Sequence, residues 1–327
     1  MIVFHFTMAF KLDSEFSAAT STAVGPSAPP SAMPEDIETR RQNFATKFKP
    51  LLAMQFPRIP WISKKNFFTT SADGHEVLLR WYSKTTSITS STSGPAILFI
   101  HSGGLIYADV STFDGLVEEY VSQCDVPYLS VEYRLAPEHK YPKALEDVYA
   151  GLAWLHAHAA ELGVNPDRIA IHGESAGGGL AAALAIYSRQ MKGPRIAKQI
   201  LIYPMLDDRV VKSDSFIEPH LVWSGADNEY GWRAYLGDKR GGADVPSTAA
   251  AARLEDPTGL PPLYAEVGVL DLFRDQVIEY VNIFLRAGVD AELHLLPGVP
   301  HGFEWFASRS KIGRTAMRLR KEAAQSI

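Results

Sequence analysis

The chain has 327 residues, of which 46% are hydrophobic and 21% charged, so it is long and apolar enough to bury a substantial core. Lysine and arginine number 32 against 37 aspartate and glutamate, a formal net charge of −5, which argues against a nucleic-acid partner. Cys124 is the only cysteine, which excludes an intramolecular disulfide and a multi-thiolate zinc site and favours a reducing compartment.

The opening segment, MIVFHFTMAF, is apolar but lacks the basic stretch that begins a signal peptide. No run of the chain approaches the roughly 18 apolar residues that a membrane-spanning helix needs. We therefore expect no membrane span and a cytoplasmic protein.

Residues 14–34 are rich in Ser, Ala, Thr and Pro and have little apolar periodicity, so we expect a mobile arm there. Residues 35–56 are predicted to be helical, because their apolar side chains are spaced for one face. These side chains are Ile37, Phe44, Phe48, Leu51 and Leu52. Residues 1–65 are thus interpreted as an arm and part of a cap.

From about residue 66, short β-type runs alternate with longer helical ones. The strand candidates are EVLLRWY, AILFI, PYLSVEY, RIAIH, KQILIYP, LYAEVGV and AELHLLP. The clearest helix is predicted over residues 143–162, where apolar residues recur at helical spacing. Alternation of this kind predicts an α/β fold, a mostly parallel central sheet with helices on both faces. Its core is expected in two parts, residues 66–204 and 251–327.

Residues 205–250 interrupt the alternation between two predicted strands and are rich in aromatic side chains. An insertion of this length in a strand-to-helix connection usually carries function, often as a lid. We expect it to form a cap with the N-terminal helix, over the strand ends where open α/β sheets bind ligands.

The sequence GESAGGG places Gly173, Ser175 and Gly177 in a GxSxG pattern between a predicted strand and a helix of small residues. A strand that turns directly into a helix strains its central residue and leaves no room for side chains at the flanking positions. The pattern therefore predicts an exposed nucleophilic hydroxyl. A glycine-rich turn with a helix-capping serine is the structural alternative.

A serine nucleophile needs a base, a carboxylate that orients the base, and donors for the oxyanion. Asp271 follows one late predicted strand and His301 follows the next, in the chain order that this arrangement requires. As alternatives, Asp271 could cap the helix beginning near Phe273, Asp275 could do the same or pair with Arg274, and His301 could be an exposed loop histidine.

The donors are expected to be the amide of Ala176 and amides of the loop that follows the strand AILFI. Gly103 and Gly104 would let that loop approach a substrate closely, although paired glycines are also ordinary in turns. Bulky apolar side chains suggest an aromatic-lined substrate pocket, which core packing would explain nearly as well. These side chains are Leu105, Tyr107, Trp223 and Trp232.

With those residues identified, the sequence from about residue 66 onward resembles the hormone-sensitive-lipase-like family of α/β-hydrolase carboxylesterases. HSGGL is similar to the family's HGGGx loop, and YRLAPE to the segment of the same sequence. GESAGG is similar to GDSAGG, DLFRD to DPLRD, and PHGF to the histidine motif. The resemblance implies an α/β-hydrolase fold with a helical cap.

The resemblance also implies catalytic and oxyanion-binding roles for six residues. They are Ser175 as nucleophile, His301 as base, Asp271 as its orienter, and the amides of Gly103, Gly104 and Ala176 as the oxyanion hole. Ser102 departs from the pattern, because the family usually has glycine there, and its side chain is expected to alter the loop or add a hydroxyl near the acyl pocket. Glu174 is expected to brace neighbouring loops.

The expected function is therefore that of a serine carboxylesterase that hydrolyses short to medium acyl esters through a covalent acyl-enzyme, with no metal or organic cofactor. Its expected partner is a small-molecule ester, and a homodimer is left open. A lactonase or a deacetylase of a secondary metabolite would use the same triad. A non-catalytic small-molecule receptor, as in the plant gibberellin receptors, is disfavoured because the histidine that such proteins can lose is present.

Overall fold

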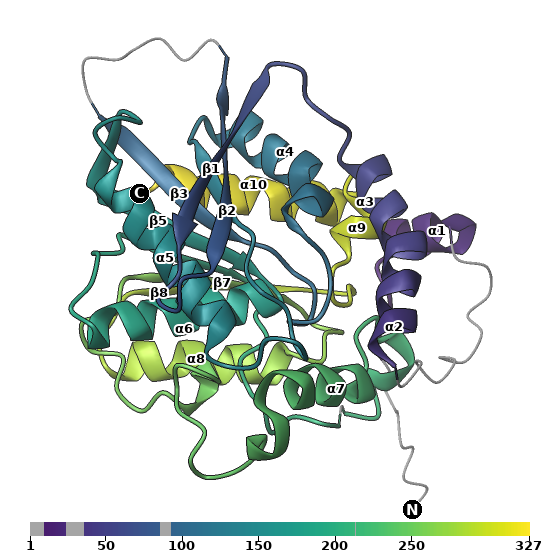
Figure 1. Ribbon diagram of the computed structural model, residues 1–327. Helices are drawn as coiled ribbons and strands as arrows, with labels where there is room; N and C mark the ends of the chain where they lie inside the picture. Colours follow the sequence, from purple (N-terminus) through teal and green to yellow (C-terminus); the bar gives the residue numbers. More distant parts are fainter. Residues whose placement is uncertain (1–9, 24–35, 86–92, 213) are drawn as a thin grey trace, which may run out of the picture.

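The computed structural model describes residues 10–23, 36–85, 93–212 and 214–327 (Figure 1). Within these ranges an eight-stranded sheet has the order β1-β2-β4-β3-β5-β6-β7-β8. The pairs β1/β2 and β2/β4 are antiparallel and the others are parallel, which confirms the predicted, mostly parallel α/β sheet. The strands are β1 (Ile62–Thr70), β2 (Glu76–Lys84), β3 (Gly94–Ile100), β4 (Tyr128–Val131), β5 (Val164–Glu174), β6 (Gln199–Ile202), β7 (Leu263–Gly268) and β8 (Ala291–Leu296).

Helices cover both faces of the sheet, as the alternating pattern predicts (Figure 1). One face carries α5 (Lys143–Ala157), α6 (Ala176–Gln190) and α8 (Arg274–Arg286). The other carries α4 (Asp114–Cys124) and α10 (Lys311–Gln325). Both faces are thus shielded from water, which is why the inner strands read as continuous apolar runs.

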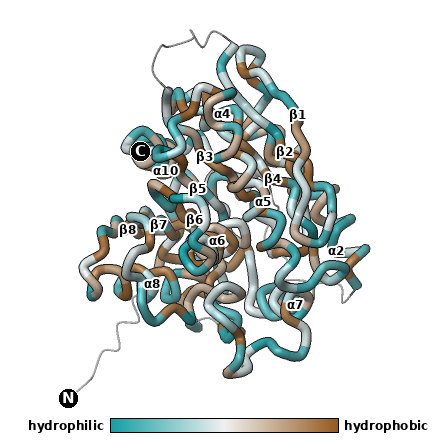
Figure 2. The backbone as a smooth tube through the Cα atoms, turned by 60° about the vertical axis from the view of Figure 1, so that its left-hand side comes forward, coloured by the Kyte–Doolittle hydropathy of each residue, from teal (hydrophilic) through white to brown (hydrophobic). Residues whose placement is uncertain are grey.

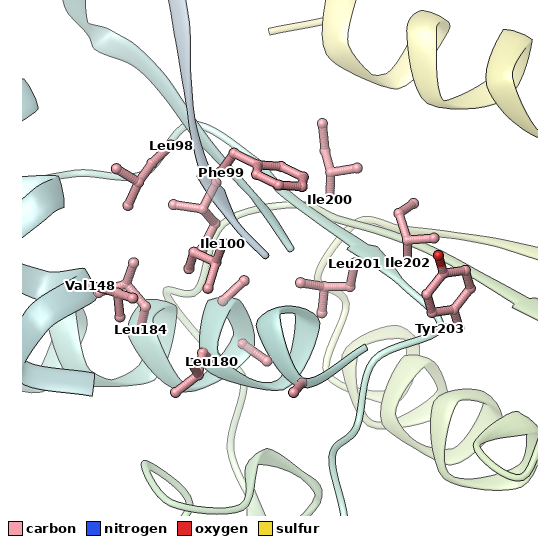
Figure 3. Close-up of a cluster of buried hydrophobic side chains, with 14 of the residues drawn as sticks. Leu98, Phe99, Ile100, Val148, Leu180, Leu184, Ile200, Leu201, Ile202 and Tyr203 are labelled. Atoms are coloured by element: carbon pink, nitrogen blue, oxygen red, sulfur yellow. The ribbon is translucent and has the colours of Figure 1, made fainter. Parts of the chain in front are cut away.

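The core is centred on β3, β5 and β6, whose alternate side chains point to opposite faces. Figure 3 shows Ile100 and Leu201 directed toward α6, with Phe99 and Ile200 on the other side of the sheet. All four are 0% exposed, so each contributes about 1.5–3 kcal/mol of burial relative to an exposed side chain. In Figure 2 hydrophobic stretches lie mainly along these inner elements.

Strand β1 was not predicted from the sequence. It pairs along its whole length with β2, from Ile62 opposite Lys84 to Thr70 opposite Glu76. Because β1 is an edge strand with much of its surface in water, its sequence ISKKNFFTT carries few apolar residues and gives a weak signal.

The prediction of a mobile arm over residues 14–34 is corrected for its first half. Helix α1 (Ser14–Ala23) begins after Asp13, whose side chain accepts from the amide of Phe16 at 2.9 Å. Phe16 is 4% exposed and its ring lies edge-on to Phe306 at 6.3 Å. Packing against the C-terminal part of the chain supplies the stability that the composition of this segment lacks. The rest of the predicted arm, 24–34, lies outside the described residues.

The predicted helix over residues 35–56 consists of α2 (Ile37–Asn43), a π-helical turn (Phe44–Phe48) and α3 (Lys49–Gln55). The insertion between β6 and β7 contains α7 (Gly225–Leu236). Figures 1 and 2 both show α2 and α7 side by side, and an ion pair of 3.0 Å between Arg40 and Asp227 joins them. Within the described ranges, no helix combines the length and the hydrophobicity needed to cross a bilayer.

Candidate active site

Ser175 occupies the turn between β5 and α6 with φ 54° and ψ −118°, a strained conformation for a residue with a side chain. The flanking glycines are required by close backbone contacts. A Cβ at Gly173 would lie 2.1 Å from the carbonyl oxygen of Gly177, and one at Gly177 would lie 2.0 Å from that of Ile100. The turn is held by the Ser175 amide, which donates to Ile202 O at 2.9 Å. The side chain of Ser175 makes no capping hydrogen bond to α6, so the alternative of a capping serine does not describe this turn.

His301 and Asp271 meet Ser175 in one buried row of hydrogen bonds. The Ser175 hydroxyl donates to His301 Nε2 at 2.8 Å, and His301 Nδ1–H donates to Asp271 Oδ2 at 2.8 Å. The rings of Tyr203 and Phe273 pack edge-on against the imidazole, at 4.6 Å and 5.0 Å between centroids. The imidazole is therefore fixed in one orientation, with only 6% of the residue exposed.

The alternatives for the acidic residues are resolved by their contacts. Asp271 is 0% exposed, and besides holding His301 it accepts from the amide of Phe273 at 2.8 Å through its second oxygen. Asp275 instead pairs with Arg274 at 2.7 Å on an exposed surface. Both carboxylate oxygens of Asp271 are thus bound to donors, which fixes this side chain beside His301.

The loop after β3 presents Gly103 and Gly104 beside Ser175, with φ of 133° and 59°. A Cβ at Gly104 would lie 2.4 Å from the ring of Trp223. Among the described residues, no group accepts a hydrogen bond from the amides of Gly103 or Gly104. Amides left free beside a nucleophile are suited to bind a developing negative charge.

The same loop is held from behind by His101, which is 1% exposed. Its ring stacks on Tyr133 at 4.2 Å, and the Tyr133 hydroxyl donates to His101 O at 2.9 Å. Burial lowers the pKa of His101 to about 4, so the ring is neutral and Nδ1–H donates to Ser102 O at 2.7 Å. Residues of the HSGGL and YRLAPE motifs thus support each other.

A pocket of about 260 Å³ opens onto Ser175 and His301. Its wall includes Tyr107 and Trp223, two of the apolar candidates from the sequence. Leu105 and Trp232, the other two, are not among the residues that border it, and both are buried in the hydrophobic core. Residue type alone does not distinguish a core side chain from a pocket side chain.

The pocket also contains residues that the sequence analysis did not single out for this role. Helix α2 and the turn after it contribute Arg40, Phe44 and Phe48, and the segment after His301 contributes Trp305. The predicted apolar face of the N-terminal helix was a signal for the two phenylalanines, whereas nothing local in the sequence marks Arg40. No group of three or more His, Cys, Asp or Glu in the described part of the chain could hold a metal ion.

A buried ionic cluster lies behind the turn that carries Ser175. Arg320, on α10, contacts Glu266 at 2.7 Å and Glu304 at 2.9 Å, and all three are 0–1% exposed. Tyr120 donates to Glu174 at 2.6 Å and accepts from Arg320 at 3.0 Å. Burial raises the pKa of Glu174 to about 7, the nearby Arg320 opposes that shift, and Glu304 adds to it. Glu174 is thus fixed to the cluster behind β5, which fits the expected bracing role.

The strand order and the turn that carries Ser175 are those of an α/β hydrolase. The chain belongs to the hormone-sensitive-lipase-like family of these proteins, and the family model, described as an alpha/beta hydrolase fold, matches residues 97–305. The resemblance drawn from the motifs is therefore confirmed.

Two relatives and one solved structure illustrate the likeness. Esterase LipI of Mycobacterium tuberculosis is 36% identical over 216 residues, 65% of this chain and 67% of the relative. Carboxylesterase NlhH of the same species is 35% identical over 219 residues, again 65% of this chain and 67% of the relative. A structure described as a bacterial heroin esterase has a TM-score of 0.86 and 32% identity, covering 97% of this chain and 98% of the other. These relatives bear out the predicted class of enzyme, a carboxylic ester hydrolase.

Proposed function

We propose that this chain is a serine carboxylesterase in which Ser175 is the nucleophile, His301 the general base and acid, and Asp271 the residue that orients it. The observation that carries the proposal is the unbroken row of hydrogen bonds from Ser175 through His301 to Asp271, at the floor of a pocket. Free glycine amides beside the nucleophile and the esterase names of the relatives support it.

The first half of the reaction forms the acyl-enzyme. Ser175 Oγ attacks the ester carbonyl carbon while His301 Nε2 takes the hydroxyl proton, and the amides of Gly103, Gly104 and Ala176 bind the resulting oxyanion. The bond to the alcohol oxygen then breaks, and His301 gives its proton to that oxygen. The alcohol leaves and the acyl group stays bound to Ser175.

The second half repeats these steps with water. His301 removes a proton from the water as its oxygen attacks the acyl carbonyl, and the proton returns to Ser175 Oγ as the acyl bond breaks. Each turnover consumes one water and releases one acid and one alcohol. The chemistry uses only side chains and amides of the chain.

We also propose that 1–65 and 205–250 supply the cap, apart from residues 62–65, which belong to strand β1 of the sheet. The contact between Arg40 and Asp227 and the presence of both residues in the pocket wall support this. With a pocket of about 260 Å³, acyl chains of short to medium length are the favoured substrates. In a p-nitrophenyl ester series from acetate to palmitate, kcat/KM should fall at the long end. A cytoplasmic location remains a prediction, which cell fractionation tests. The oligomeric state, left open by the sequence, can be measured by light scattering.

Replacing Ser175 by alanine tests the assignment. Loss of the nucleophile should lower kcat on p-nitrophenyl esters by about 10⁴- to 10⁶-fold with the melting temperature nearly unchanged. Ser188→Ala is the matched control, because Ser188 lies on the same helix but its hydroxyl donates to Pro194 O at 2.8 Å, away from the pocket. An alanine variant at 175 that kept most of the activity would contradict the mechanism. Ligand binding with no turnover of any activated ester or lactone would instead favour a receptor.

A further inference from the structure

An arginine is buried in the wall of the proposed substrate pocket. The Arg40 side chain is 5% exposed, and its guanidinium lies 3.9 Å from the centre of the Tyr230 ring. Arginine is seldom buried unless its donors are paired. Burial of the Arg40 guanidinium therefore carries an unfavourable desolvation free energy, and the residue borders the pocket where a substrate would lie.

The pairing of Arg40 is incomplete. A guanidinium has five N–H donors, and the one hydrogen bond that the Arg40 guanidinium makes to a carboxylate of the described residues runs from Nη1 to Asp227 Oδ1 at 3.0 Å. Its Nε is buried and has no partner among the described residues. Burial raises the pKa of Tyr107, and a contact of its hydroxyl with the Arg40 guanidinium opposes that rise; the buried hydroxyl has no other partner among the described residues. Unpaired buried donors are rare in folded proteins and call for an acceptor.

The second oxygen of Asp227 is already engaged. It accepts from the Ser224 hydroxyl at 2.6 Å and from the Ser224 amide at 3.2 Å. Asp227 is thus fixed at the start of α7 and holds Arg40 by one contact, so the remaining donors of Arg40 stay available to another group. The pair is neutral as a whole.

The charge at the mouth of the pocket is positive. Lys47, from the turn after α2, also lines the pocket and is exposed, and it forms no ion pair with a described residue. The pocket wall therefore contains two cations against the single carboxylate of Asp227, among the described side chains that border it. Both an uncharged carbonyl oxygen and a carboxylate are compatible with this balance.

We propose that the preferred substrates carry a second oxygen acceptor, a carbonyl or a carboxylate, which binds Arg40 while the reacting ester lies at Ser175. This inference rests on the proposed esterase function and specifies its substrate class. Arg40 precedes residues 97–305, the part that the family model matches. The proposal thus assigns the specificity to the N-terminal helix, outside that part.

Matched esters test the proposal with the wild-type protein. For the acyl side, the p-nitrophenyl esters of pentanoate, 4-oxopentanoate and glutarate have the same chain length and differ only in the distal oxygen. For the alcohol side, pentyl acetate, 4-oxopentyl acetate and 5-acetoxypentanoate serve in the same way by pH-stat titration. We expect kcat/KM for an oxygen-bearing ester to exceed that of its alkyl counterpart by about 10- to 100-fold in one of the two series. The ketone and carboxylate arms distinguish the two kinds of acceptor.

Variants of Arg40 distinguish a role in substrate binding from a purely structural role in holding the cap helices together. Arg40→Lys keeps a cation for Asp227 but lacks Nε–H and the planar fork, and Arg40→Gln combined with Asp227→Asn removes both charges together. In both variants, the ratio of kcat/KM for the oxygen-bearing ester to kcat/KM for its alkyl counterpart should fall to within about threefold of one. Arg41→Lys is the matched control, since Arg41 lies on the same helix but binds Glu138 at 2.7 Å and does not line the pocket. It should leave the preference ratio unchanged.

The outcomes are distinguishable. A wild-type ratio near one in both series, or a ratio that survives both Arg40 variants, would overturn the proposal while leaving the esterase function intact. A purely structural Arg40 would lower kcat/KM for all esters alike. Failure of the esterase function would appear separately, as absence of turnover of every ester in both series.

Discussion

Glu174 is buried next to Ser175, the proposed nucleophile, and its exchange for glutamine gives a stability prediction with a definite dependence on pH. The pKa of Glu174 rises from 4.5 to about 7, chiefly through burial. The folded protein therefore binds this proton more tightly than the unfolded chain does. The stabilisation from this group is present at acidic pH and is lost as the pH rises from about 4.5 to 7.

The magnitude follows from the same pKa values. A rise from 4.5 to about 7 corresponds to about 3 kcal/mol of unfolding free energy, of which about 2 to 3 kcal/mol falls between pH 5 and pH 8. Glutamine cannot ionise, but its side-chain oxygen can still accept from Tyr120, as the carboxyl does at 2.6 Å. Glu174→Gln should therefore match the wild type within about 1 kcal/mol at pH 5 and be more stable by about 2 to 3 kcal/mol at pH 8.

Urea unfolding of both proteins at pH 5, 6, 7 and 8 measures this difference, and subtracting the curves removes the titration of all groups that the proteins share. Glu76→Gln is the control, because Glu76 is exposed at the start of β2 and its exchange should give a flat difference. Parallel curves for Glu174→Gln and the wild type would show that Glu174 does not change its protonation in this range, and the reasoning would fail.

Two further exchanges test the packing around the site. Gly104→Ala should lower kcat/KM and stability, because its Cβ would lie 2.4 Å from the Trp223 ring. Gly74→Ala is the control, because Gly74 has φ +86° and no atom within 4 Å of the added Cβ. It should show only the roughly 1–3 kcal/mol strain of a positive φ in thermal and urea unfolding. Equal kinetic effects of the two exchanges would contradict the close contact. Arg320→Met should cost about 3–5 kcal/mol in urea unfolding because two buried glutamates lose their cation, while Arg318→Met, from an exposed pair on the same helix, should cost under about 1 kcal/mol. Similar losses for both arginines would refute the special position of Arg320.

The core of the fold was predictable because its signals are local. β3 and the second half of β5 are short apolar runs, and Ser175 follows β5 in a glycine-flanked pattern typical of a tight strand-to-helix turn. Asp271 and His301 follow late strands, and in a parallel sheet such strand ends lie along one edge. Their convergence could therefore be expected from chain order, although the distances could not.

Other features depend on contacts between distant parts of the chain. Arg40 reads locally as one more charge on a helix, and only its contact with Asp227, 187 residues away, places it in the pocket wall. Helix α1 lacks a strong apolar pattern and is held by the docking of Phe16. Trp232 is an aromatic residue of the kind that often lines pockets, but it packs in the hydrophobic core. Local patterns do not carry this information.

The position of Arg320 has a consequence for biosynthesis. During translation, Glu266 and Glu304 leave the ribosome before Arg320, the cation with which both pair in the described part of the native fold. Until α10 is synthesised, closing the sheet over both carboxylates would bury uncompensated negative charge, so a nascent chain halted before residue 320 should keep this region open. The buried cluster behind Ser175 can therefore close only after α10 has been synthesised and Arg320 has paired with both glutamates.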